Sequence, residues 1–219
     1  TARDVPPFDG WLVTGVPRFD SQDRLFNAAA LITPQGRTEA LYDKRRLVPF
    51  GEYIPFRRFL PFADALVGPT DFAPADGNRL FTLPHYGHMQ VLICYETLFP
   101  GDVVAPGPRP DMLVNLTNDA WFGHTPGPFQ HLAQARMRAV EEGIPMVRVA
   151  NTGISAVFDG GGRKLGEIGL GETGFLDVRV PPSLPQTIYA RWREVLFLAM
   201  LGGLVFAVVC LDRARSIRQ

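Results

Sequence analysis

Apolar residues lie along the chain in short runs, separated by turns that are rich in glycine and proline. Runs of this length predict strands that are buried on at least one face. Strands are therefore expected over residues 11–16, 25–32, 39–42, 89–94, 112–117, 145–150, 155–158, 164–168 and 173–180. Pro17 is expected to close the first strand, and turns at 33–36 and 159–162 are expected to form hairpins.

One helix is expected between these strands, over residues 128–142, with Gly143 ending it. Strands and helix alternate around it, while hairpins dominate both ends of the chain. This alternation favours a mixed sheet in an α/β sandwich with helices on the outside. The long connection 45–78 carries loosely spaced apolar side chains at 56–67, where a short amphipathic helix is expected. The connection is either an ordinary packed loop or a lid or membrane-facing arm.

The segment 195–211 is apolar and contains no charged residue. As a helix it would be roughly 26 Å long at ~1.5 Å per residue, slightly short of a hydrocarbon core of about 30 Å. Trp192 extends it as an interfacial anchor, so a transmembrane helix is expected over residues 192–212. The alternative is a buried core helix, which the pair Gly202-Gly203 would weaken in water.

This segment sets the expected domain boundaries. Residues 1–180 are expected to form the globular domain, 181–191 a proline-rich linker and 213–219 a cytoplasmic tail, since arginines follow the apolar segment. The globular part is then expected to face outward, into the periplasm if the source is a Gram-negative bacterium. No signal peptide opens the sequence, so the export element is expected upstream and the chain is expected to be a fragment.

Composition narrows the function classes. With 219 residues, 46% of them hydrophobic, the chain is long enough to bury a sizeable core as one domain. Its formal net charge of zero argues against a nucleic-acid-binding surface. The four histidines have no close ligand spacing, so no metal is expected. Of the two cysteines, Cys210 lies inside the apolar segment, and a disulfide with Cys94 is not expected.

Cys94 is the first candidate for chemistry. It ends an apolar strand-like run and is followed by Tyr95-Glu96, so the sulfur is expected at a strand end, where a following helix N-terminus would stabilise a thiolate. A lysine and a carboxylate upstream, Lys44 and Glu52, supply the charges that thiol chemistry needs. The alternative for an isolated cysteine is a small buried hydrophobic residue.

Three motifs combine these residues. They are YDKRRLVPFGEYIP at residues 42–55, ICYE at 93–96, and NDAWFG at 118–123 followed by RMRA at 136–139. Together they resemble the bacterial apolipoprotein N-acyltransferase family. The resemblance implies a nitrilase-like αββα sandwich of the carbon-nitrogen hydrolase superfamily, with its N-terminal part missing here, followed by one C-terminal transmembrane helix.

The family resemblance also implies a Glu-Lys-Cys triad. Cys94 matches the nucleophile and Lys44 the catalytic lysine. The Lys44 ammonium and the N–H of Tyr95 are the candidates for stabilising an oxyanion. Glu52 matches an additional carboxylate that orients the lysine, and Asn27 matches a position near the active site.

Other residues near these motifs have two possible roles. One possible role, shaping an acyl pocket, applies to Glu96, Tyr95, Trp121 and Phe122. For the three aromatic residues the alternative is packing in the core. The charged candidates also have ordinary alternatives, because lysines flanked by arginines are usually solvated. Glu52 would then pair with a nearby arginine, at 57 or 58, and Asn27 would satisfy a strand end.

The sequence departs from the family pattern at the general base. The family's glutamate lies further upstream of the lysine than this sequence extends, and Glu39, which precedes Lys44, belongs to the wrong strand. The fragment alone is therefore expected to be inactive.

The resemblance implies acyl transfer from a phospholipid, through a thioester on Cys94, to the N-terminal amine of a diacylglyceryl-apolipoprotein at the bilayer. No cofactor is implied. Two alternatives remain at this point: a nitrilase-type amidase acting on small amides, and a catalytically silent membrane-anchored domain.

Overall fold

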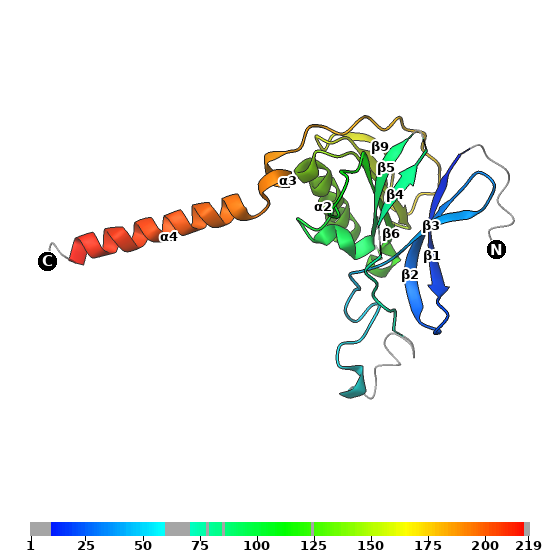
Figure 1. The fold of residues 1–219 in the computed structure, drawn as a ribbon, viewed down its shortest axis with the longest axis horizontal. Coiled ribbons are helices and arrows are strands. Elements are labelled where there is room, and N and C mark those ends of the chain that lie inside the picture. Colours follow the sequence, from blue (N-terminus) through cyan, green and yellow to red (C-terminus); the bar gives the residue numbers. More distant parts are fainter. Residues whose placement is uncertain (1–9, 60–70, 78, 85, 124, 217–219) are drawn as a thin grey trace.

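The computed structural model describes residues 10–59, 71–77, 79–84, 86–123 and 125–216, with only the backbone described for Arg58 and 211–216. In this part of the chain two sheets pack together, one helix covers the larger sheet, and a second helix projects away from the body (Figure 1).

The smaller sheet contains three antiparallel strands in the order β1-β2-β3. They are β1 (Leu12–Phe19), β2 (Leu25–Ile32) and β3 (Thr38–Asp43). The first strand continues past Pro17, which was expected to end it. Because β1 is an edge strand of this sheet, a residue without an N–H does not interrupt the ladder.

The larger sheet is mixed, in the order β4-β5-β6-β7-β8-β9. Its strands are β4 (Leu80–Leu83), β5 (Gly87–Ile93), β6 (Met112–Asn118), β7 (Met146–Asn151), β8 (Ser155–Phe158) and β9 (Lys164–Ile168). The three central strands β5, β6 and β7 are parallel, and the others pair antiparallel. The sequence analysis did not anticipate β4, and the strand expected over 173–180 does not form.

The principal helix, α2 (Gly127–Glu142), ends at Gly143, which adopts φ 67° in the left-handed region. Within the described ranges, three short 3-10 turns also form: η2 (Arg57–Phe59), η3 (Cys94–Leu98) and η4 (Asp119–Phe122). The amphipathic helix expected near 56–67 falls largely outside the described residues, and η2 is the part of it that can be described.

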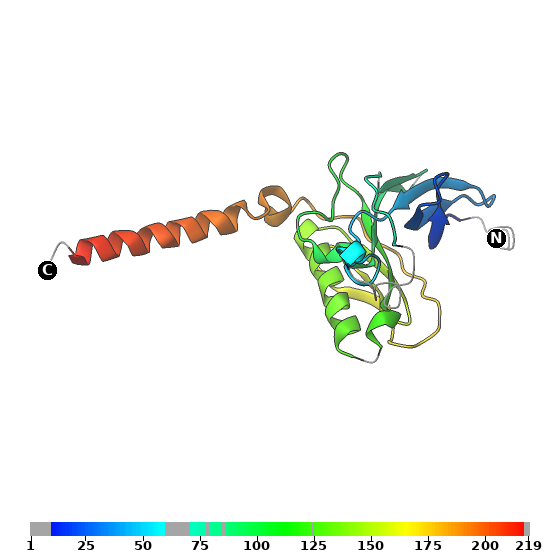
Figure 2. The same ribbon diagram turned by 90° about the horizontal axis from the view of Figure 1, so that it is seen from below.

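Two apolar clusters hold the layers together. The first lies between the sheets and joins Leu31 and Tyr42 of the smaller sheet to Val91 and Val114 of the larger one. The second lies between the larger sheet and α2, where Ala135 and Ala139 pack on sheet residues. Figures 1 and 2 show α2 on the face of the larger sheet that is turned away from β1-β2-β3. The expected α/β sandwich is therefore confirmed, with the layers described here running sheet, sheet, helix.

The segment before the C-terminal helix is attached to the body by α3 (Ile188–Trp192). The Thr187 hydroxyl donates to the Glu141 carbonyl, and Arg193 forms an ion pair with Glu142, both on α2. The residues expected as a linker, 181–191, therefore include a helical turn that packs on the domain, where Ala190 is buried.

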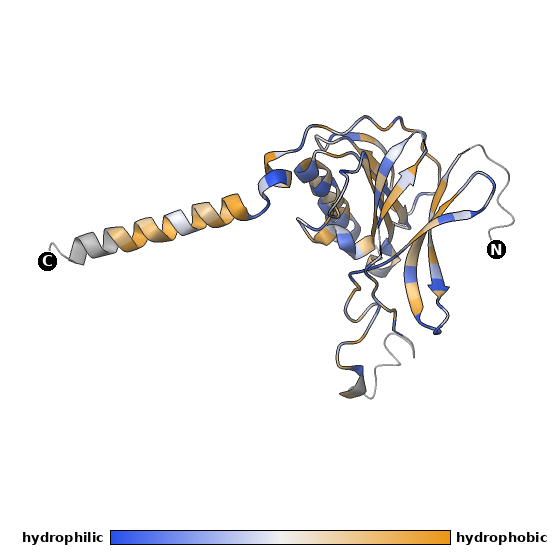
Figure 3. Ribbon diagram, viewed as in Figure 1, coloured by the Kyte–Doolittle hydropathy of each residue, from blue (hydrophilic) through white to orange (hydrophobic). Residues whose placement is uncertain are grey.

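The C-terminal helix α4 (Val195–Ser216) extends away from the body, and its described side chains are exposed and mostly apolar (Figure 3). Among the described residues, no helix has both the length and the apolar composition that crossing a membrane requires. The transmembrane helix expected over 192–212 is thus not supported. Its expected start was Trp192, but the backbone turns at Arg193, with φ 49°, and separates Trp192 from α4.

Candidate active site

Cys94 lies at the junction between strand β5 and turn η3, beside the carboxyl ends of the parallel strands β6 and β7. Ligands of parallel sheets commonly bind at this edge. Its backbone has φ 49°, a left-handed conformation that costs a non-glycine residue free energy. The residue is partly exposed and lines a cavity of about 990 Å³. The strand end expected for the sulfur is observed, but the element that follows is a 3-10 turn and not an α-helix.

Lys44 and Glu52 meet at the same cavity. The Lys44 ammonium donates to both carboxylate oxygens of Glu52, at 2.9 and 2.8 Å. Both residues are buried, with Lys44 only 1% exposed. The solvated lysine that the sequence left open is therefore excluded. Glu52 does not form the alternative ion pair with Arg57, because Arg57 pairs with Asp71.

Two further groups fix the Glu52 carboxylate. The side-chain amide of Asn27, on β2, donates to its Oε1 at 2.7 Å, and the Val48 N–H donates to its Oε2 at 2.8 Å. The Asn27 carbonyl also accepts the Lys44 N–H at 2.8 Å. Asn27 thus links strand β2 to the lysine and to the carboxylate, and it lines the cavity itself.

Aromatic residues surround the remainder of the cavity. Tyr95, Trp121, Phe122 and Phe50 line it, together with aliphatic residues of β1, β6 and β7. Trp121 is 75% exposed and Phe122 is 40% exposed. Neither therefore packs in the core, which was one of the two roles expected for them. The Tyr95 ring packs edge-on against the Phe99 ring.

Glu96, on turn η3, is buried and is not among the residues that line the cavity. Its carboxylate accepts hydrogen bonds from the Tyr42 hydroxyl at 2.5 Å, the Ile93 N–H at 2.8 Å and the Arg45 N–H at 3.0 Å. Burial and the adjacent Glu96 charge raise the pKa of Tyr42, so its hydroxyl stays protonated and donates. Glu96 therefore ties the strand end that carries Lys44 to the strand end that carries Cys94.

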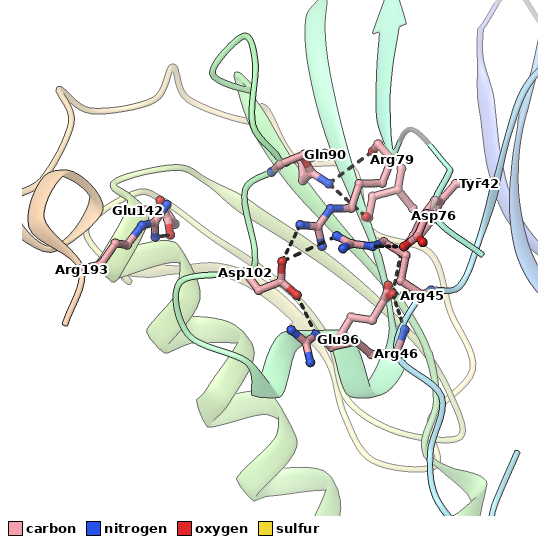
Figure 4. Close-up of polar contacts among 12 residues, drawn as sticks. Tyr42, Arg45, Arg46, Asp76, Arg79, Gln90, Glu96, Asp102, Glu142 and Arg193 are labelled. Carbon is pink, nitrogen blue, oxygen red and sulfur yellow. Dashed lines mark hydrogen bonds and ion pairs between the residues drawn. The ribbon is translucent and has the colours of Figure 1, made fainter. Parts of the chain in front are cut away.

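Arginines on the same side reinforce this connection (Figure 4). Asp102 accepts a hydrogen bond from Arg46 at 2.6 Å and one from the buried Arg79 at 3.1 Å. Burial alone would raise the pKa of Asp102, but the Arg46 hydrogen bond and the charges of Arg79 and Arg46 hold it below its usual value. The arginines after Lys44 thus have structural partners.

The sequence analysis missed a second buried cluster, formed by Asp119, His131 and Arg148. Arg148 Nη2 lies 2.6 Å from Asp119 Oδ2, and His131 Nδ1 lies 2.9 Å from Asp119 Oδ1. Burial alone would raise the pKa of Asp119, but the His131 hydrogen bond and the Arg148 charge hold it below its usual value. Burial lowers the pKa of Arg148, and the charges of Asp119 and of a Cys94 thiolate oppose that effect.

One signal in the sequence points to this cluster. The buried positions of α2 are Pro128, His131, Ala135, Arg138, Ala139 and Glu142. They recur at intervals of three and four, as one face of a helix does. A histidine at one of these positions, between Pro128 and Ala135, predicts a buried polar contact, although not its partner.

Comparisons with known proteins identify relatives of the chain. The carbon-nitrogen hydrolase family profile matches residues 7–189. The chain is 44% identical over 193 residues to the apolipoprotein N-acyltransferase of Bradyrhizobium diazoefficiens, covering 84% of this chain and 36% of that protein. It is 37% identical over 189 residues to the enzyme of the same name from Rickettsia prowazekii, covering 86% of this chain and 38% of that protein.

Solved structures agree on the fold. Saccharomyces cerevisiae Nit3, a nitrilase-superfamily member, matches with a TM-score of 0.57 and 19% identity, covering 78% of this chain and 60% of its own. An amidase from Nesterenkonia sp. matches with a TM-score of 0.55 and 22% identity, covering 88% and 67%. The chain spans little more than a third of the curated relatives that it matches. With the profile covering most of its length, the chain belongs to the carbon-nitrogen hydrolase family.

Proposed function

We propose that this chain forms the acyl-transfer site of a lipoprotein N-acyltransferase, acting at the periplasmic face of a bacterial inner membrane. The observation that carries the proposal is that Cys94 and the buried Lys44–Glu52 pair line one large cavity. The name that the curated relatives share, apolipoprotein N-acyltransferase, supports an apolipoprotein as the acceptor. The proposed acyl donor is a phospholipid, and the proposed acceptor group is the amine of a diacylglyceryl-apolipoprotein.

In the first half-reaction the Cys94 thiolate attacks the ester carbonyl carbon of the phospholipid. A C–S bond forms and the carbonyl oxygen becomes an oxyanion, which the Lys44 ammonium and the Tyr95 N–H stabilise. The intermediate collapses with cleavage of the ester C–O bond. The proton taken from the thiol is returned to the departing oxygen, so a lysophospholipid leaves and a thioester remains.

In the second half-reaction the free amine of the lipoprotein attacks the thioester carbon. A C–N bond forms, the C–S bond breaks, and the proton lost by the amine returns to the sulfur. The products are an amide and the free Cys94 thiol. The same two oxyanion donors serve both steps, since the negative charge develops on the same oxygen.

The proton carrier in this scheme is the family's general-base glutamate. Among the described residues that line the cavity, Glu52 carries the only carboxylate, and Lys44 occupies both of its oxygens. Glu52 is therefore not assigned as this base. Glu52 orients Lys44 and balances its charge next to the position where the oxyanion forms.

The shape of the cavity favours lipid substrates over small amides. A volume of about 990 Å³ is at the upper end for small-molecule sites, and Trp121 lines it while remaining 75% exposed. Exposed aromatic and apolar side chains beside a cavity are typical of proteins that meet a membrane. Amide hydrolysis by the same thiol and lysine would not need this apolar border.

The test is detection of the acyl-enzyme. The protein, expressed from its complete gene, is incubated with phospholipid vesicles that lack an acceptor and is then digested for mass spectrometry. An acyl group on Cys94 that hydroxylamine removes is expected. The Cys94→Ser variant should carry no thioester, and Cys210→Ala should behave as wild type. An acyl group at another residue, or a thioester that survives Cys94→Ser, would contradict the proposal.

A further inference from the structure

Beneath Cys94 lies a histidine to which the acyl-transfer scheme gives no role. His131 is 3% exposed and reaches up from α2 toward turn η3. Its Nε2 lies 3.2 Å from the Cys94 carbonyl oxygen and 3.2 Å from the Thr97 hydroxyl, which itself donates to that carbonyl at 3.1 Å. The histidine therefore contacts the backbone of the proposed nucleophile.

We propose that His131 is a positioning residue for Cys94. By donating from Nε2 to the Cys94 carbonyl, it holds the nucleophile and the adjacent Tyr95 N–H in the left-handed backbone turn at Cys94, which is called the elbow below. This inference rests on the proposed role of Cys94 as nucleophile.

The backbone conformation gives such a contact a purpose. Cys94 has φ 49°, where an L-residue with a side chain is strained, so the surrounding structure must maintain it. The peptide group that follows Cys94 contains both the carbonyl that His131 contacts and the N–H of Tyr95. Fixing that carbonyl also fixes the N–H, because the peptide unit is planar.

The remainder of the cluster immobilises the histidine. Asp119 accepts from His131 Nδ1 at 2.9 Å and from the Thr117 hydroxyl at 3.2 Å. Arg148 holds the other Asp119 oxygen at 2.6 Å and is itself fixed by Asn115 at 2.5 Å. Strands β6 and β7 and turn η4 therefore hold the imidazole from behind, and the Phe122 ring packs edge-on against it.

The groups that face His131 define what a substitution removes. They are Asp119, Arg148, Thr97 and the Cys94 backbone. Asp119 and the Cys94 carbonyl are both acceptors, so a ring N–H can donate to each of them. His131→Gln keeps a long amide that can donate to the Cys94 carbonyl, but it removes the imidazole ring. His131→Asn keeps a donor for Asp119 but is too short to reach the carbonyl.

The experiment compares these two variants in the protein expressed from its complete gene. Acylation of Cys94 is followed as the burst of nitrophenolate from p-nitrophenyl butyrate. Alkylation of Cys94 by iodoacetamide, which needs the thiolate but no oxyanion donor, is the second readout. His88→Gln and His88→Asn on β5 are matched controls, because His88 lies outside the cavity lining and contacts Thr82.

Positioning predicts that His131→Asn lowers the acylation rate about tenfold, the scale of one lost hydrogen bond, while alkylation changes less than about twofold. His131→Gln should recover most of the acylation rate, and both His88 variants should match wild type. Amide hydrogen exchange over residues 94–98 should rise in His131→Asn alone. An equal loss of acylation rate in His131→Asn and His131→Gln would mean that the imidazole ring matters and the hydrogen bond to Cys94 does not. An unchanged acylation rate in both variants would mean that the contact is irrelevant. Either result overturns the proposal.

The two proposals fail separately. A wild-type protein that alkylates at Cys94 but gives no burst contradicts acyl transfer, and the hydrogen-exchange comparison then decides the positioning role. If His131→Asn fails to fold, acylation and hydrogen exchange in Thr97→Val, which removes the neighbouring donor to the same carbonyl, decide it. Weaker acylation with faster exchange at 94–98 supports the elbow as the target, and no change in either contradicts it.

Discussion

Two buried cations near Cys94, Lys44 and Arg148, differ in their hydrogen bonds and in their access to the cavity. Lys44 and Arg148 are each only 1% exposed. Among the described residues, Lys44 gives two of its three N–H donors to Glu52 and lines the cavity. Arg148 bonds to Asp119, Asn115 and the Ile154 carbonyl, and it does not line the cavity. A cation with a spare donor beside a cavity is suited to chemistry, and one whose three nitrogens are all bonded away from the cavity is suited to support.

Replacing the nucleophile is expected to have the largest effect. Cys94→Ala should abolish transfer of acyl groups to lipoprotein, because no other described cysteine lies at the cavity. Acylation is measured with radiolabelled phospholipid and a synthetic diacylglyceryl peptide. Cys210→Ala is the control and should retain full activity. Residual transfer by Cys94→Ala would show that Lys44 serves some other nucleophile.

Breaking the supporting cluster should cost stability. Asp119→Asn leaves the Arg148 charge buried without its carboxylate, a change that costs about 3–5 kcal/mol of unfolding free energy. Urea titration at neutral pH measures this cost. Asp159→Asn, in an exposed turn where it pairs with Arg163, should stay within about 1 kcal/mol of wild type. A similar loss in both variants would contradict the supporting role of Asp119.

The same variant has a characteristic pH dependence. The pKa of Asp119 is held below its ordinary value of 3.8, so the carboxylate loses its proton more readily in the folded state than in the unfolded chain. Its stabilisation is therefore complete above that value and is lost as the pH falls through the lower folded-state pKa. The stability difference between wild type and Asp119→Asn should be constant near neutral pH and shrink below about pH 3.8. A difference that grew with acid would contradict this sign.

Altering the chemical cluster should reduce rate more than stability. Glu52→Gln keeps the shape of the side chain but removes the charge opposite Lys44, and the acylation rate should fall about 100-fold, the scale of a disturbed oxyanion donor. The cost in unfolding free energy should be about 1–3 kcal/mol, below that of Asp119→Asn. Burst kinetics and urea titration on one preparation give both values. A larger stability loss than in Asp119→Asn would assign Glu52 to support.

The smallest effect is expected at the border of the cavity. Trp121→Ala should leave stability unchanged, because the side chain is 75% exposed, and should raise KM for long-chain phospholipid about tenfold through lost apolar contact. KM for p-nitrophenyl butyrate should not change. Phe175→Ala, another exposed aromatic residue that does not line the cavity, is the matched control. An equal KM change for short and long acyl groups would remove Trp121 from lipid binding.

Sequence patterns predicted the elements well where burial is two-sided or a turn is strongly encoded. Strands 25–32, 155–158 and 164–168 form as expected, and so does the helix that ends at Gly143. The prediction failed for 173–180, an apolar run that finds no neighbouring strand to pair with. It also missed β4, whose short run becomes a strand only through pairing with β5. Strand formation depends on a partner that local sequence does not specify.

By itself the sequence determined which residues carry charge and sulfur, and its motifs singled out Lys44, Glu52 and Cys94 as candidates. Only the tertiary structure decided that Lys44 and Glu52 are bonded to each other, that Glu96 faces away from the cavity, and that His131 lies under the Cys94 carbonyl. The physical reason is that hydrogen bonds and burial depend on distances between chain segments far apart in sequence. Those distances are set by the packing of two sheets and a helix.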